Sequence, residues 1–278
     1  MFSATDAATR TARRSVRLVA WVRAWRAGLI PLDDVADEIT GDEEHLLADV
    51  PGHWTEAPLR EGLAVLSKLH PDEIRLVLPA PGDPLGLPGP GTPFTGAALV
   101  AGEGVIAGDL GLVPQVRSHT SGSGDTFESV VWRCHQLPAG APGGGITAPD
   151  PDAPAVVARI NEPTPAEAEA ELAAALAAAT AELTRLDVAQ WRPELAGALA
   201  ALRRRDDGSE LPPVYNPRAR RLYARASILD RVLALADHVA PGGAVNTYEA
   251  QQRDAALRPL MAACRRALVA ACNASLAP

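Results

Sequence analysis

The clearest periodic segment of the chain runs from Asn216 to Val239. Leucine, isoleucine, valine and alanine recur there at the three- and four-residue spacing of a helical face. Asn216 can cap free backbone N–H groups, and Pro217 is preorganised for a first helical turn. Pro241 and the glycines after it end the segment. The pattern therefore predicts a helix over these residues.

Three more helices are predicted in the C-terminal part of the chain. Thr164 and Glu167 have the spacing of a capping box before a leucine-striped segment. A shorter helix is expected over 193–204, and a last one begins near Asn246, with a kink expected at Pro259. Short connections favour antiparallel neighbours, so the pattern predicts a four-helix array.

The N-terminal part begins with an amphipathic helix predicted over residues 5–28. Its apolar face carries Leu18, Trp21, Val22, Trp25 and Leu29. Its flanks carry Arg10, Arg13, Arg17, Arg23 and Arg26. The acidic segment 33–49 is predicted as a solvated helix that partly neutralises these arginines, and a third helix is predicted over 58–69.

Strand-like runs follow, separated by turn residues. They cover 73–78, 97–100, 104–107, 111–116 and 127–137. Short connections predict a small, mainly antiparallel sheet, and alternation in the last run places Val130, Trp132 and Cys134 toward a core. The predicted fold class is α+β. Its expected parts are helices and sheet over 1–137, a Gly/Pro linker over 138–154 and helices over 155–278, with one or two cores left open.

Composition narrows the function classes. The net charge of −8 argues against general nucleic-acid binding, because phosphate contacts need a basic surface. Lys68 is the only lysine beside many arginines, alanines, prolines and glycines, which indicates the coding bias of a GC-rich bacterial genome. Three scattered cysteines favour a reducing cytoplasm. No apolar run approaches the ~20 residues of a membrane span.

An arginine row is the first candidate site. Arg218, Arg221 and Arg225 lie on one side of the Asn216–Val239 helix, near an N-terminus that itself favours anions. Guanidinium groups grip carboxylates and phosphates, and Tyr215 could stack on the same ligand. The alternative is that these arginines are solvated or pair with acids of the 33–49 segment.

The other polar motifs do not form a catalytic constellation. The loop 118–125 lacks the spacing of a nucleophile elbow and the Gly-Lys of a phosphate loop. Cys134 and His135 are neighbours on a predicted strand, so their side chains point to opposite faces. No histidine pair has metal-ligand spacing. The sequence therefore predicts no catalytic residues, no metal and no cofactor.

Two functions remain open. The first is a non-catalytic cytoplasmic adaptor that docks a protein partner through Trp21, Trp25 and Arg17 of the first helix. The second is a small-molecule enzyme or sensor that holds an anionic ligand with the arginine row, between sheet and helices. A membrane-surface role for the first helix ranks below both.

Overall fold

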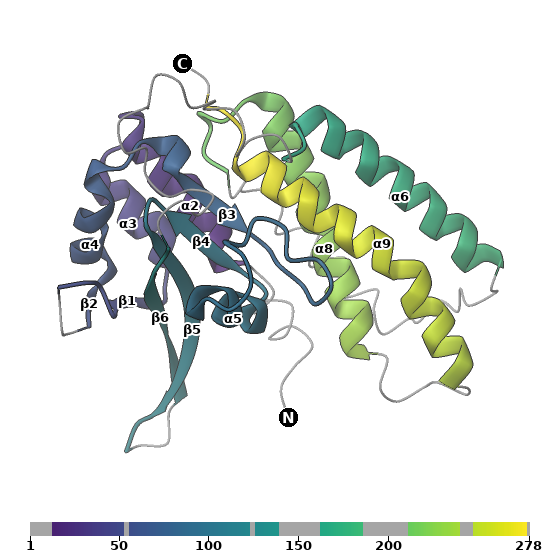
Figure 1. The fold of residues 1–278 in the computed structure, drawn as a ribbon, viewed down its shortest axis with the longest axis horizontal. Helices are drawn as coiled ribbons and strands as arrows, with labels where there is room; N and C mark the ends of the chain where they lie inside the picture. Colours follow the sequence, from purple (N-terminus) through teal and green to yellow (C-terminus); the bar gives the residue numbers. More distant parts are fainter. Residues whose placement is uncertain are drawn as a thin grey trace. The chain divides into compact units, whose positions relative to one another are not determined.

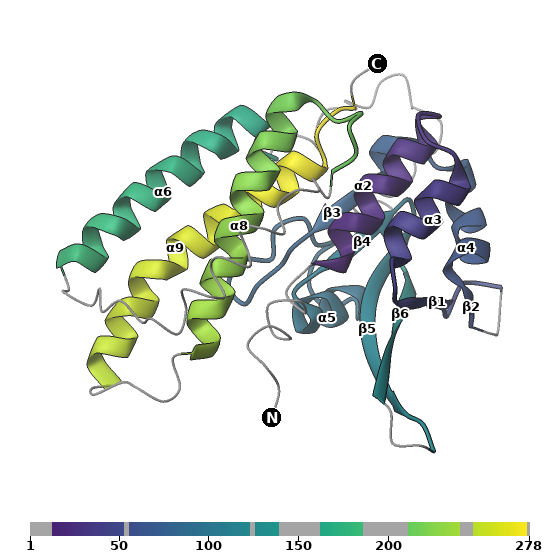
Figure 2. The same cartoon turned by 180° about the vertical axis from the view of Figure 1, so that it is seen from behind.

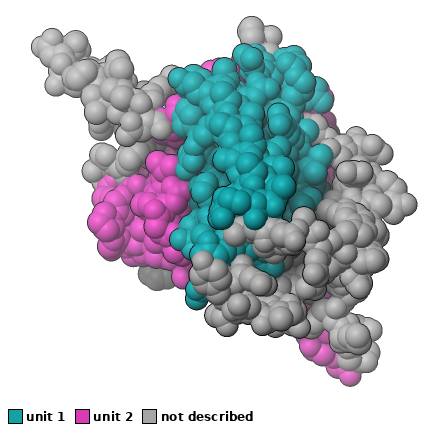
Figure 3. All heavy atoms as spheres, turned by 90° about the vertical axis from the view of Figure 1, so that its right-hand side faces the viewer, with its two compact units in different colours: residues 1–12, 163–209, 215–274 teal, residues 13–162, 210–214, 275–278 magenta. Residues whose placement is uncertain are grey.

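The structure is a computed structural model and describes residues 13–52, 56–122, 126–138, 162–185, 211–239 and 247–276. Its fold is α+β, as predicted, with helices before the sheet and a helical region after it (Figure 1). The described residues cluster into two compact units (Figure 3). One contains the sheet and its helices, and the other contains three long helices.

The sheet has six strands in the order β2-β1-β6-β5-β4-β3. Their bounds are Glu44–Ala48 (β1), Ala57–Pro58 (β2), Ile74–Val77 (β3), Gly104–Ala107 (β4), Leu110–Thr120 (β5) and Thr126–Gln136 (β6). The pair β1–β6 is parallel and the other neighbours are antiparallel, so the sheet is mixed. The parallel pair brings β1, the first strand, beside β6, the last strand among the described residues.

Three helices cover one face of the sheet (Figures 1 and 2). They are α2 (Arg14–Arg26), α3 (Leu32–Thr40) and α4 (Leu59–Gly62). The pairing register places Leu76, Leu112 and Trp132 on a single face, and all three are fully buried. Val130, Trp132 and Cys134 are buried as the alternation predicted.

Helix α5 (Pro93–Ala101) and the Pro/Gly-rich loop before it pack on the opposite face. Phe94 is fully buried in this second layer, and its ring lies against Gly104 of β4 and Gly111 of β5. Leu87 from the loop belongs to the same cluster. The loop therefore contributes to the core, and strand β4 is buried on both faces.

The expected strand at 97–100 is wrong, because these residues belong to helix α5. The Thr92 side chain accepts a hydrogen bond from the backbone N–H of Thr95, and Pro93 occupies the first turn. Gly102, with a φ of 70°, ends the helix in the left-handed conformation. The apolar run was too short for its periodicity to separate a strand from a buried helix.

The expected single helix over 33–49 is also wrong. Helix α3 ends at Thr40, Gly41 takes a φ of 53°, and the chain continues into strand β1. The segment 58–69 is helical, but α4 has a single turn and continues as a 3₁₀ helix over Leu63–Lys68. The acidic residues therefore divide between a helix, a turn and a strand.

The second unit contains α6 (Pro165–Arg185), α8 (Pro217–Val239) and α9 (Thr247–Cys272). The capping box of α6 is confirmed: Glu167 accepts from the Thr164 backbone at 2.8 Å, and Thr164 Oγ1 accepts from the Glu167 backbone at 3.3 Å. Pro259 lies inside α9. The expected helix at 193–204 lies outside the described residues, so the four-helix count stays a prediction.

Membrane crossing is not supported by these helices. Across the described residues, every helix is too short or too polar to pass through a lipid bilayer. The cytoplasmic location stays a prediction.

The tight contact between α5 and β5 gives a stability prediction. A Cβ atom on Gly111 would lie 2.6 and 2.7 Å from Cγ and Cε2 of Phe94, so Gly111→Ala forces the ring aside. We expect it to lower the free energy of unfolding by about 1–3 kcal/mol, the usual cost of overpacking. Denaturant unfolding followed by circular dichroism measures this change.

Gly96→Ala is the matched control on α5. Gly96 is exposed, and a Cβ there meets no atom within 4 Å. We expect this change to be neutral or to stabilise by up to about 1 kcal/mol, because alanine suits a helix interior better than glycine. Equal effects of the two substitutions would contradict the assigned packing of Phe94.

Candidate functional site: a docking groove beside a buried polar network

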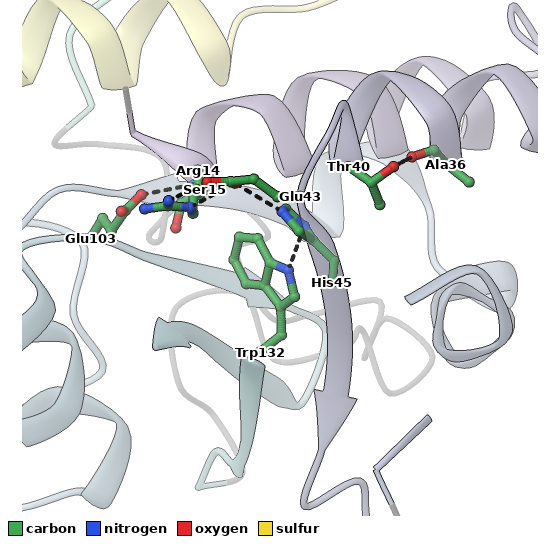
Figure 4. Close-up of polar contacts among 8 residues, drawn as sticks. All are labelled: Arg14, Ser15, Ala36, Thr40, Glu43, His45, Glu103 and Trp132. Carbon is green, nitrogen blue, oxygen red and sulfur yellow. Dashed lines mark hydrogen bonds and ion pairs between the residues drawn. The ribbon is translucent and has the colours of Figure 1, made fainter. Parts of the chain in front are cut away.

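A buried polar network ties helix α2 to the sheet (Figure 4). The indole N–H of Trp132 donates to Nδ1 of His45 at 3.3 Å, and Nε2 of His45 lies 3.2 Å from Glu43 Oε2. Arg14 donates from Nε and Nη2 to the two oxygens of Glu43, at 3.0 and 2.5 Å. The network thus joins β6, β1, the turn before β1 and the first turn of α2.

The proton positions in this network follow from its donors. The indole of tryptophan can only donate, so Nδ1 of His45 accepts and its Nε2–H donates to Glu43. Burial lowers the pKa of His45, although the Glu43 carboxylate opposes the shift. Burial of Glu43 acts to raise its pKa, but hydrogen bonds from Arg14 and His45 outweigh it and hold that pKa below its ordinary value. The native network therefore contains neutral His45 and ionised Glu43.

The start of α2 has a cap from outside the helix. Arg13 precedes the helix and makes no side-chain cap hydrogen bond. Instead, Glu103, just before β4, accepts from the Ser15 backbone N–H at 2.7 Å (Figure 4). The Glu103 oxygen satisfies one of the free N–H groups at the helix start, although burial raises the pKa of this carboxyl.

A surface groove of about 650 Å³ runs along α2, α3 and the segment between them. Its apolar lining consists of Trp21, Leu29, Ile30 and Pro31. Its polar lining includes Arg17, Asp34, Asp37 and Glu38. The acids recur at helical spacing on α3, opposite an arginine and a tryptophan one turn apart on α2. This groove is the candidate functional site.

Most arginines of the first helix have internal roles. Arg14 binds Glu43, and Arg13 donates to the Gly102 carbonyl at 3.2 Å. Arg23, predicted as a flanking residue, is instead 1% exposed, with its guanidinium bound to Asp72 and the Pro71 carbonyl. Arg26 donates to the Leu69 carbonyl at 2.9 Å.

The three predicted docking residues separate into two groups. Trp21 and Arg17 line the groove. Trp25 does not line it, and its ring lies 5.2 Å from the guanidinium carbon of Arg26. The Arg17 guanidinium makes no ion pair with another residue in the described part of the chain. Leu29, expected on the buried face, is 41% exposed at the groove.

The acidic side chains of the groove are also accessible to a ligand. Asp34, Asp37 and Glu38 are exposed and make no ion pair within the described ranges. Their neighbour Asp33 differs, because it pairs with Arg60 at 3.0 Å and does not line the groove. Three acids and one arginine leave the groove acidic.

The predicted arginine row lies on α8. Arg218, Arg221 and Arg225 are all exposed, and Arg218 contacts Glu169 of α6 at 3.2 Å. Tyr215 is 1% exposed, and its hydroxyl donates to the Cys272 carbonyl at 3.1 Å. Its phenol is therefore engaged inside the helical unit. Anion binding by this row stays a prediction.

The described cysteine, histidine and acidic side chains outside the groove are the other candidates for a nucleophile or a metal site. Burial raises the pKa of the Cys134 thiol to about 12, which keeps it protonated and unreactive at neutral pH. Among the described residues, no group of three or more His, Cys, Asp or Glu side chains could hold a metal ion.

Sequence reasoning missed the roles of His45, Glu43 and the three groove acids. The acids were interpreted as part of one long solvated helix. The available signal was the change after Gly41, where His45, Leu47 and the residues between them begin a strand-like alternation. That signal indicates that the acidic helix is short and ends before a strand.

The network predicts how stability depends on pH. Unfolded His45 takes up a proton near pH 6.5, whereas the native residue does so only at lower pH. The unfolded state therefore binds more protons as pH falls below about 6.5, and the free energy of unfolding decreases. We expect His45→Gln to flatten this part of the profile and to cost about 1–3 kcal/mol at neutral pH.

Denaturant unfolding between pH 5 and pH 8 measures the profile. The variant should keep a smaller slope, because burial also lowers the pKa of His135. An unchanged slope in His45→Gln would show that the native histidine is not held neutral.

Comparison with known proteins gives relatives for both parts of the chain. Residues 15–152 match the model of the Rv1486c-like protein, N-terminal domain, and residues 166–269 match that of the Rv1486c-like protein, C-terminal domain. The "Uncharacterized protein Rv1486c" of Mycobacterium tuberculosis (strain ATCC 25618 / H37Rv) is 28% identical, over 94% of this chain and 96% of its own. No solved structure matches significantly. The chain is thus similar to the Rv1486c-like family over both of that family's domains, in the same order.

Proposed function

We propose that this protein is a non-catalytic binding module that docks a protein partner in the groove between α2 and α3. The observation that carries the proposal is the lining itself: an accessible tryptophan beside charges of both signs that make no ion pair among the described residues. Tryptophan and arginine are the residues most enriched at energetically important positions of protein interfaces. An exposed groove with such a lining suits a polypeptide segment.

The contacts that fix helix α2 indicate that the groove is a preformed binding surface. Helix α2 is fixed at its start by Arg14 and near its end by Arg23 and Arg26. The groove residues Arg17 and Trp21 lie between these attachments. Because the helix is held at both ends, its backbone does not have to be ordered when a partner binds.

The charge of the groove favours a protein over a membrane. Helices that bind anionic membranes combine an apolar face with cationic residues. Here Asp34, Asp37 and Glu38 lie in the groove with Trp21. Their carboxylates would repel anionic headgroups.

Tryptophan substitutions test the docking site. Trp21→Ala should abolish or weaken by at least about tenfold the capture of a partner from native lysate, as expected for a central interface tryptophan. Trp25→Ala is the matched control, because Trp25 belongs to the same helix but does not line the groove. Pull-down with the full chain, followed by titration of the recovered partner, measures both effects.

Thermal unfolding of each variant shows whether the chain still folds. Equal retention of the partner by both folded variants would contradict docking at Trp21. Equal loss in both would assign the effect to α2 as a whole.

A further inference from the structure

We infer that the partner segment of the α2–α3 groove is basic and inserts an arginine between Trp21 and the acids of α3. This inference rests on the proposed docking function and specifies its partner. Its basis is charge complementarity: the groove contains the carboxylates Asp34, Asp37 and Glu38 and a single cation, Arg17. A basic polypeptide segment therefore complements it better than an acidic or neutral one.

The acids are arranged to receive a guanidinium group. Asp34, Asp37 and Glu38 recur at three- and four-residue spacing on α3, so their carboxylates project from one helical face. None is neutralised by another residue in the described ranges, whereas Asp33 on the same helix already pairs with Arg60. Arginine can bind such carboxylates with two parallel N–H···O bonds.

Trp21 gives arginine an advantage over lysine. The indole is half-buried at the groove, so part of its ring remains accessible. A planar guanidinium can stack on this ring while it donates to carboxylates at its edge, which a compact ammonium group cannot do as well. The same helix shows the pairing within the chain, where the Arg26 guanidinium carbon lies 5.2 Å from the Trp25 ring.

Arg17 sets the register of the segment. It lies one turn before Trp21, and its Nη1 would be 3.5 Å from a Cβ placed on Gly41, at the end of α3. The Arg17 cation disfavours a second basic residue at this end of the groove and favours an acidic group or a free C-terminal carboxylate there. The expected segment is therefore basic at one end only.

The test uses the full-length chain and a short labelled peptide that alternates arginine and leucine in its N-terminal half and ends in a free C-terminal carboxylate. Two matched peptides replace every arginine by citrulline, which is neutral and similar in shape, or by glutamate. Fluorescence anisotropy should show binding of the arginine peptide, at least about tenfold weaker binding of the citrulline peptide and no binding of the glutamate peptide. Added salt should weaken binding of the arginine peptide.

Paired variants locate the effect. Asp37→Asn with Glu38→Gln should weaken arginine-peptide binding by about tenfold, because two exposed charge contacts are lost. The control, Asp33→Asn with Glu61→Gln, changes net charge equally at exposed acids outside the groove, and should retain wild-type affinity. Equal weakening in both would show that overall charge, not the groove, attracts the peptide.

Other results overturn the inference in distinguishable ways. Equal binding of the citrulline and arginine peptides would show that the groove recognises the shape of the side chain and not its positive charge. Absence of peptide binding, together with capture of a lysate partner that depends on Trp21, would reject the basic partner and keep the docking function. Self-association that disappears in Trp21→Ala would show a second copy of the chain as the occupant.

Discussion

The hydrogen-bond chain from Trp132 to Arg14 is the constraint on which the sheet unit depends. A buried indole N–H needs an acceptor, and His45 of the neighbouring parallel strand supplies it. Because this histidine accepts at one nitrogen, it must donate at the other, and Glu43 receives that proton. A partly buried carboxylate needs a cation, which Arg14 provides. Each link requires the next, so the sheet and the first helix are positioned together.

This constraint explains how arginines are used along α2. The helix must lie over the face that contains Trp132, and its charged side chains have to find partners at the rim of that face. Arg14 does so at the start, and Arg23 reaches Asp72 from a fully buried position. Arginine is suited to this because its long apolar stem can be buried while its head group is hydrogen-bonded. Arg17, in the middle, is the residue left for the groove.

The sequence predicted those elements whose local signals agreed with their tertiary setting. The capping box at Thr164 and the Asn216-Pro217 start located α6 and α8, because a cap is a short-range interaction. The sequence-based prediction was wrong at 97–100, where a short buried run fits both a helix and a strand. The cap at Thr92 favours the helix. Sequence reasoning also could not anticipate that Glu43 and His45 belong to a network, since their partners lie 29 and 87 residues away in the chain.

At the candidate site too, the sequence predicted the local features and missed those that depend on long-range contacts. Helical periodicity correctly placed Arg17 and Trp21 one turn apart, but it could not separate Trp21 from Trp25, which differ only in what surrounds them. It also could not show that α3 lies beside α2, because that depends on Gly41 turning the chain into β1 and on β1 pairing with β6. The groove therefore depends on the packing of α3 beside α2. Arg14, Arg17 and Trp21 recur at three- and four-residue spacing, so they share one side of α2. Arg14, at the start of the helix, pairs with Glu43, whereas Arg17 and Trp21 further along line the groove with the acids of α3.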